Sequence, residues 1–169
     1  VSFFGTTTET ITRLRLSSNS LTPDRTYTFE LNFLSSNQAD LRVATIDVSV
    51  NDIPQPGLYT VSPRIGFEAR TSFRFTASQW TDAHLPLDYH FSYYDVINGT
   101  RKTLRARHAE NTVVTLLPRG GFAQGNDSIP FPLTCTVEVY DILSAHGSLS
   151  LEVSVNSSNM SSDDLSEFY

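Results

Sequence analysis

Apolar and polar side chains alternate along several short segments of this chain, with the period of two that a half-buried β-strand requires. The clearest case is residues 88–94, where Tyr89, Phe91 and Tyr93 share one face. The same pattern predicts further strands at residues 11–16, 27–33, 44–50, 59–62, 71–77, 112–117, 133–140 and 149–155. Short strands separated by turn residues predict an all-β protein.

Prolines and a glycine at residues 54–57 separate these strands into two groups. The second group has about seven strands, the number in a complete immunoglobulin-like or fibronectin type III-like sandwich. The first group has fewer, so we expect tandem β-sandwiches of which the first is partial. The predicted parts are the C-terminal part of a first sandwich at 1–53, a joint at 54–57, a complete sandwich at 58–156 and a flexible, polar tail at 157–169.

The charge pattern argues against nucleic acid as a partner. The net charge is −6, and the basic residues are scattered except for one short group. That group comprises Arg101, Lys102, Arg105 and Arg107. It follows an Asn98-Gly99 turn signal and is interpreted as the solvent face of a strand, with an anionic-ligand patch as the alternative.

The chain has one cysteine, Cys135, so an intrachain disulfide and a multi-cysteine metal site are excluded. By the period of two, its thiol shares a face with Leu133, Val137 and Val139. We therefore expect a buried cysteine that packs as a small apolar side chain rather than a nucleophile.

No motif indicates catalysis or metal binding. The four histidines lie outside the spacings of zinc sites and of known nucleophile motifs. A calcium site at Asn51-Asp52 would lack most of the six to eight oxygen ligands that the ion prefers. The sequence thus predicts no enzyme, no cofactor and no metal. A hydrolytic enzyme is the weakest alternative, and the histidines to consider for it are His84, His90, His108 and His146.

No stretch approaches the ~20 apolar residues of a membrane span, and the N-terminus lacks a signal-peptide pattern. We expect a soluble piece of a larger protein that carries any signal or anchor elsewhere. Sequons for N-glycosylation favour an extracellular setting. They begin at Asn98, Asn126, Asn156 and Asn159, in segments expected to be turns or tail.

Two motifs carry a family resemblance. The run from Leu21 to Tyr27 resembles the opening of strand F in fibronectin type III domains, where the tyrosine hydroxyl binds upstream backbone. Trp80-Thr81-Asp82, followed by Pro86-Leu87-Asp88-Tyr89, joins a core tryptophan to a strand start. With residues 54–57, 61–63, 69–75, 117–120 and 137–141, these motifs make the chain resemble the REJ (receptor for egg jelly) module of polycystin-like proteins. Its fold-defining residues are then Tyr27, Trp80 and Tyr89.

The resemblance implies a non-catalytic structural or adhesive module in the ectodomain of a large membrane protein, on cilia or gamete surfaces. Such a module would act as a spacer, an assembly unit or a protein-interaction unit. The alternative is recognition of a glycan or glycoprotein by sandwich-end loops, with Asp82, His84 and Leu85 as the candidate loop. Expected partners are proteins or glycans at the cell surface, including copies of the chain and neighbouring domains.

Exposed apolar residues would distinguish an assembly surface from a plain spacer. A contiguous patch marks an assembly surface, whereas scattered residues favour a spacer. The residues expected off the core are Leu34, Tyr94, Phe122 and Phe131.

Overall fold

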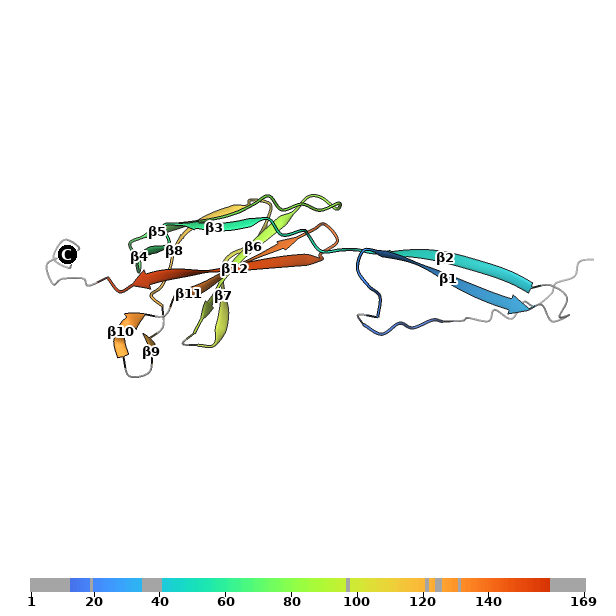
Figure 1. Ribbon diagram of the computed structural model, residues 1–169, viewed down its shortest axis with the longest axis horizontal. Helices are drawn as coiled ribbons and strands as arrows, with labels where there is room; N and C mark the ends of the chain where they lie inside the picture. Colours follow the sequence, from blue (N-terminus) through green and yellow to red (C-terminus); the bar gives the residue numbers. More distant parts are fainter. Residues whose placement is uncertain are drawn as a thin grey trace, which may run out of the picture. The chain divides into compact units, whose positions relative to one another are not determined.

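The structure is a computed structural model of the chain (Figure 1). It describes residues 13–18, 20–34, 41–96, 98–120, 122–123, 126–130 and 132–158. These residues form strands, turns and irregular segments without a helix, which confirms the predicted all-β fold. The chain divides into two compact units, Val1–Asn51 and Asp52–Tyr169.

In the first unit, β1 (Arg25–Leu34) and β2 (Leu41–Val50) form a two-stranded antiparallel sheet. Residues 13–18 lie outside any strand, so the strand predicted at 11–16 is not found in its described part. The Tyr27 hydroxyl accepts a hydrogen bond from the Thr22 main-chain N–H at 2.8 Å. Hydrogen bonding with the Thr22 side chain, and then with its main chain, lowers the pKa of Tyr27. That the unit belongs to a first sandwich stays a prediction.

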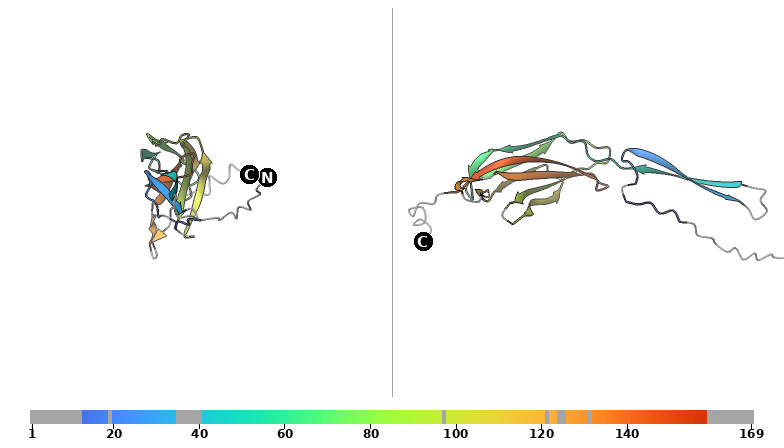
Figure 2. Two further views of the ribbon diagram at one scale, coloured as in Figure 1. Left: turned by 90° about the vertical axis from the view of Figure 1, so that its right-hand side faces the viewer. Right: turned by 60° about the horizontal axis from the view of Figure 1, so that its bottom comes forward.

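The second unit is a β-sandwich whose two main sheets form two layers (Figures 1 and 2). The larger sheet has the order β4-β12-β11-β6-β7, and the smaller has the order β3-β5-β8. A separate pair, β9 and β10, lies between β8 and β11 in the sequence. The strands are β3 (Leu58–Ser62), β4 (Ile65–Phe67), β5 (Ser72–Ser78), β6 (Asp88–Asp95), β7 (Thr100–His108), β8 (Thr112–Leu116), β9 (Phe122–Ala123), β10 (Asn126–Pro130), β11 (Leu133–Tyr140) and β12 (His146–Asn156).

The core lies between the sheets and follows the alternation in the sequence. Phe73 and Phe75 from β5 face Phe91 from β6, and all three are fully buried. The predicted stripe of β11 is also inside, and the Cys135 thiol within it is fully buried. Burial raises the pKa of that thiol to about 12, because the thiolate would lose its hydration. The prediction that Cys135 is buried among apolar side chains is confirmed.

The segment before β3 packs onto the sandwich next to Trp80. The Gln55 N–H donates to the Thr81 carbonyl at 2.8 Å, and the Thr81 N–H donates back to the Gln55 carbonyl at 3.4 Å. Pro54 and the Trp80 ring are buried, and both lie against Gly147 at the start of β12. These contacts hold the loop that follows Trp80.

The far end of β12 is held by a different pairing. Here β12 runs parallel to β4, with Ser154 opposite Ile65 and Asn156 opposite Phe67. The Ser154 N–H donates to the Arg64 carbonyl at 3.0 Å, and the Glu68 N–H donates to the Asn156 carbonyl at 2.9 Å. The sequence pattern does not reveal this pairing, because β4 is only three residues long.

Candidate functional site

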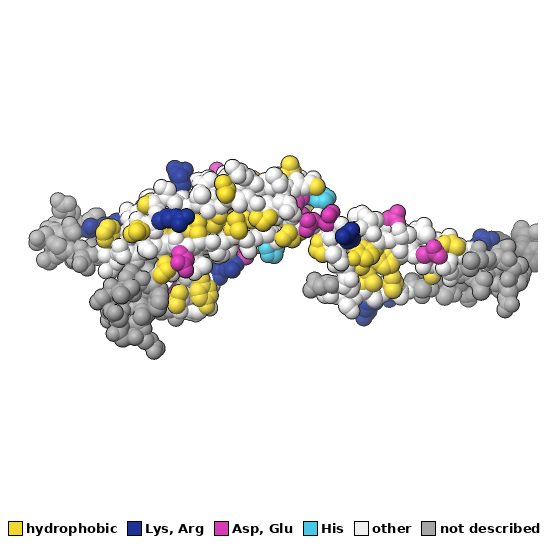
Figure 3. Space-filling view, in the orientation of Figure 1, with side chains coloured by type: hydrophobic (Ala, Val, Ile, Leu, Met, Phe, Trp, Pro, Cys, Tyr) yellow, Lys and Arg dark blue, Asp and Glu magenta, His cyan; other side chains and the backbone are white. Residues whose placement is uncertain are grey.

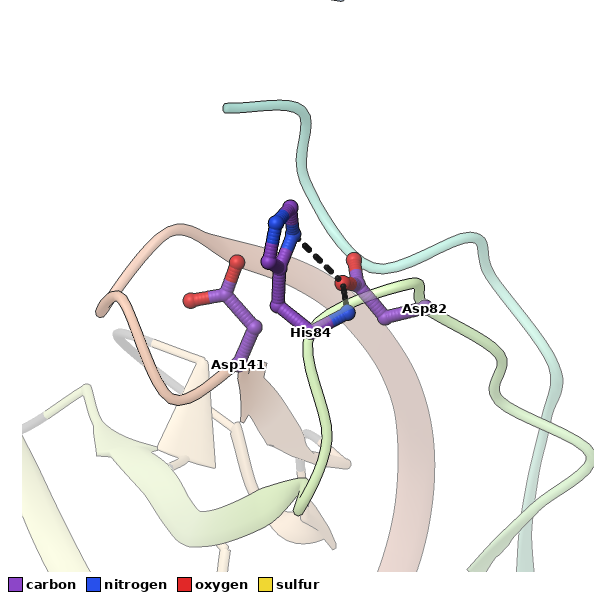
Figure 4. Close-up of side chains that lie close together, drawn as sticks. All are labelled: Asp82, His84 and Asp141. Atoms are coloured by element: carbon purple, nitrogen blue, oxygen red, sulfur yellow. Dashed lines mark hydrogen bonds and ion pairs between the residues drawn. The ribbon is translucent and has the colours of Figure 1, made fainter. Parts of the chain in front are cut away.

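Two loops meet at the end of the sandwich near Trp80. One joins β5 to β6 and carries Asp82 and His84, and the other joins β11 to β12 and begins with Asp141. Each of the three side chains offers one ligand atom, and these atoms lie within 4.8 Å of one another (Figure 4). The main-chain N–H of Ile142 donates to the His84 carbonyl at 3.3 Å, which links the two loops directly.

Asp82 is fixed by a local turn. Its Oδ1 accepts a hydrogen bond from the main-chain N–H of His84 at 2.6 Å, the i to i+2 contact that aspartate favours in turns. The His84 Nδ1 lies 3.6 Å from the same oxygen. The Asp82 side chain is only 5% exposed, whereas the His84 side chain is 46% exposed. The imidazole therefore forms the solvent side of the site, with a carboxylate beneath it.

Asp141 is fully buried and closes the second loop. Its main-chain N–H donates to the Ala145 carbonyl at 3.0 Å, and its Oδ1 accepts from the Ala145 N–H at 2.9 Å. Between them, Ser144 has a φ of 72°, in the left-handed region that non-glycine residues rarely adopt. The carboxylate thus has a defined position in a tight turn.

Arg107 on β7 supports this turn from the neighbouring strand. Its Nη2 donates to the Asp141 carbonyl at 2.9 Å and its Nη1 to the Ser144 hydroxyl at 3.1 Å. Its Nε binds the Asp88 carboxylate at 2.9 Å. The guanidinium also lies 4.7 Å from the centre of the Tyr140 ring, a cation–π geometry. One side chain therefore holds the loop to the sheet.

Exposed apolar side chains follow the cluster residues in both loops. Leu85 is 64% exposed, Ile142 57% and Leu143 58%. Exposed aliphatic side chains next to polar ones are typical of surfaces that contact a partner. The predicted binding loop of Asp82, His84 and Leu85 is thus joined by residues of the second loop.

A second polar cluster lies on the outer face of the larger sheet. Glu138 on β11 accepts hydrogen bonds from His90 at 2.8 Å and from the Tyr140 hydroxyl at 3.1 Å, and it pairs with Arg101. Burial alone would raise the pKa of Glu138. The hydrogen bonds from His90 and Tyr140 and the charge of Arg101 together lower that pKa below its usual value.

The basic group forms part of β7, and three of its members have carboxylate partners. Arg101 pairs with Glu138, Arg105 with Glu110 at 2.7 Å, and Arg107 with Asp88. These pairs favour the interpretation of a solvent-facing strand over an anionic-ligand patch.

The structure also places the predicted glycosylation asparagines, except where they lie outside the described residues. Asn98 is exposed in a turn, where its side-chain amide donates to Asp95 at 2.6 Å. Asn126 begins β10 and Asn156 ends β12, so these two lie at strand ends rather than in a turn or tail, because strand pairing extends to both. Asn159 and Phe131 lie outside the described residues, as do the side chains of Leu34 and Phe122.

The remaining predicted residues lie in or beside the sandwich core or on its surface. Trp80 is buried, and Tyr89 is partly buried against the core. Tyr94 is 45% exposed.

Asp141 is the site residue that the sequence analysis did not single out. Asp88, which the sequence places near His84, pairs with Arg107. The buried carboxylate near His84 comes instead from the end of β11. In the sequence, Asp141 could have been identified only by its position directly after the alternating apolar residues of that strand.

The two sheets of the second unit, with the loop cluster at one end, define a β-sandwich module. Among curated proteins, none matches this chain. The family model of the REJ domain matches residues 1–169, so the chain belongs to the REJ domain family. REJ domains are non-enzymatic modules in the ectodomains of polycystin-like membrane proteins, which indicates an extracellular setting. The described part of the chain has no helix able to cross a membrane.

Proposed function

We propose that this chain is an adhesive and structural unit of a polycystin-like ectodomain, and that it works through protein contacts made by its first unit. Family membership supports the ectodomain setting. The observation that carries the role is an exposed apolar face on the β1–β2 sheet.

This apolar face follows from the strand register. Tyr27 lies opposite Val48 and Phe29 opposite Ile46, so these apolar pairs share one side of the sheet. With Leu14 and Leu16 from the preceding segment, the face lines a hollow of about 640 Å³. Ile46 is 63% exposed and Leu14 69%, and Figure 3 shows apolar side chains gathered on this unit.

Such a sheet needs a covering partner. A two-stranded hairpin is at best marginally stable alone, and three strands or packing against another element are usually required. Burying one exposed Leu or Ile side chain contributes about 1.5–3 kcal/mol. We propose that the face is covered by a protein surface of the same ectodomain, either a neighbouring domain or the same face of a second copy.

The experiment places a charge on this face and measures assembly. Ile46→Glu is compared with Ser49→Glu, a change on the opposite face of the same strand, where Ser49 lies opposite Thr26. Sedimentation velocity of the full ectodomain reports self-association, and cross-linking followed by peptide mapping reports contacts within one copy. We expect Ile46→Glu to abolish the contact and Ser49→Glu to preserve it. Equal behaviour of both variants would contradict an assembly role.

We also propose that the extracellular surface carries a glycan on Asn98. The residue is exposed and lies in a turn with Gly99, whose φ is 62°. Glycan attachment would take one N–H of the Asn98 side-chain amide, which now donates to Asp95. A mass change of the peptide containing Asn98 after glycosidase treatment tests this proposal, and an unmodified peptide from the native protein contradicts it.

Recognition of a glycan or glycoprotein by the sandwich-end loops is the second candidate function. The exposed rim of Leu85, Ile142 and Leu143 favours it. A Leu143→Asp variant that loses cell-surface binding while Ile46→Glu retains it would support this function over the first. Retention of binding by Leu143→Asp would contradict it. We also propose that the ectodomain lies on cilia or gamete surfaces. Localisation of the native protein tests this.

A further inference from the structure

We propose that Asp82, His84 and Asp141 bind a divalent first-row transition-metal cation, with Zn²⁺ as the best match. This inference is independent of the assembly role proposed for the first unit. It rests on the donor set, on the burial of the carboxylates and on the way each donor is held.

The donor atoms lie close to metal-binding distances. Zinc binds imidazole nitrogen at about 2.0–2.1 Å and carboxylate oxygen at about 2.0–2.2 Å, so two ligands of one ion lie about 3–4 Å apart. The His84 Nδ1 and the Asp82 Oδ1 are already 3.6 Å apart. The whole set lies within 4.8 Å, so binding requires the widest pair of donor atoms to close by about 1–2 Å. The His84 side chain is exposed and can rotate toward the carboxylates.

The charge of the cluster favours a cation. Asp82 and Asp141 bring two carboxylates together in a largely buried position. Carboxylates this close repel each other, and burial strengthens the repulsion because water screens it less. A bound dication would neutralise both carboxylates.

The donors are also preorganised. The N–H of His84 orients Asp82, and the N–H of Ala145 orients Asp141, in the manner of the outer hydrogen bonds that position metal ligands. The pairing of Thr81 with Gln55 anchors the first loop, and Arg107 anchors the second. Because His84 is 46% exposed, the ion has an entry path and room for water at its remaining positions.

The donor types select among metals. Imidazole suits zinc, copper, iron and nickel, whereas calcium and magnesium prefer a shell of oxygens. Calcium requires six to eight oxygen ligands, and this cluster offers two carboxylates and one nitrogen. We therefore expect Zn²⁺ to bind and Ca²⁺ to leave the site empty.

The experiment uses the full chain without a polyhistidine tag, after removal of metal with a chelator. Isothermal titration with Zn²⁺ should give one site, and Co²⁺ should show the visible absorption of a nitrogen- and oxygen-ligated ion. His84→Ala should weaken Zn²⁺ binding by about 100-fold, since loss of an outer-shell partner alone costs about 10–100-fold. Asp141→Asn, which keeps the acceptor for the Ala145 N–H, should also weaken it.

A matched control is His108→Ala. His108 is exposed at the end of β7 and lies outside the cluster, so its variant should bind Zn²⁺ as the natural chain does. Circular dichroism establishes that each variant is folded. If Asp141→Asn does not fold, His84→Gln and Asp82→Asn take its place. The proposal is overturned if Zn²⁺ does not saturate the chain at millimolar concentration, if His84→Ala binds as tightly as the control, or if Ca²⁺ binds and Zn²⁺ does not.

Discussion

Gly57 lies where the chain enters β3, and a side chain at this position would collide with the backbone that leads to Trp80. An added Cβ would lie 2.1 Å from the Ser78 carbonyl oxygen, 2.5 Å from the Gln79 carbonyl carbon and 2.6 Å from the Trp80 nitrogen. These are main-chain atoms, so rotation of a side chain cannot relieve the overlap. We therefore predict that Gly57→Ala strongly destabilises the second unit.

The expected magnitude follows from the contacts that must move. Carbon atoms in ordinary contact lie about 3.5–4.0 Å apart, so the two segments must separate by about 1 Å or more. Overpacking of this kind costs about 1–3 kcal/mol. The separation also breaks the paired hydrogen bonds of Gln55 and Thr81, at about 1 kcal/mol each. Alanine also lowers the conformational entropy of the unfolded chain, which offsets about 0.4–1 kcal/mol of the lost stability. The net loss is about 3 kcal/mol.

Urea unfolding followed by tryptophan fluorescence measures this loss, because Trp80 is the single tryptophan of the chain and lies in the second unit. Gly99→Ala is the matched control. Its φ is 62°, and the nearest atom to an added Cβ is the Tyr94 hydroxyl at 3.9 Å, so only backbone strain of about 1–2 kcal/mol applies. A loss below 1 kcal/mol for Gly57→Ala, or a loss smaller than that of the control, would refute the reasoning.

Two further predictions concern titratable groups of the same unit. Because the pKa of Glu138 is lowered in the fold, its carboxylate adds stability above the ordinary pKa, and this contribution is lost as the pH falls through the lowered value. Glu138→Gln should therefore lower the urea midpoint at pH 7 and approach the natural chain in acid, while a difference that stays constant with pH would contradict this. Cys135, with a pKa of about 12, should resist thiol reagents at pH 8 until urea unfolds the sandwich. Rapid labelling of the native chain would show that the thiol is accessible.

The sequence predicted those strands that have one face in the core and the other toward solvent. In β5, β6 and β11, one face packs in the core and the other is polar, so alternation alone locates them. The three-residue strand β4 has no such pattern, because its position depends on pairing with β12, far along the chain. The described part of the first unit contains two of the three predicted strands, since residues 13–18 lack strand pairing.

Only those residues of the candidate site that lie in one loop could be predicted from the sequence. Asp82, His84 and Leu85 lie in one loop after a core tryptophan, and that loop can be recognised from the sequence. Asp141 joins them because β11 pairs with β6, with Tyr140 opposite Asp88. Sheet order is a property of the whole fold, so no spacing between His84 and Asp141 could reveal their proximity.

The parallel pairing of β4 with β12 gives the second unit a mechanical property. The chain enters beside the start of β12, where Pro54 meets Gly147, and it leaves at the other end of that strand, after Asn156. Tension applied to the two ends therefore pulls β4 and β12 in opposite directions along their length. Their hydrogen bonds, from Arg64–Ser154 to Glu68–Asn156, are loaded in shear and must break together rather than one by one. We therefore expect a module built in this way to resist stretching.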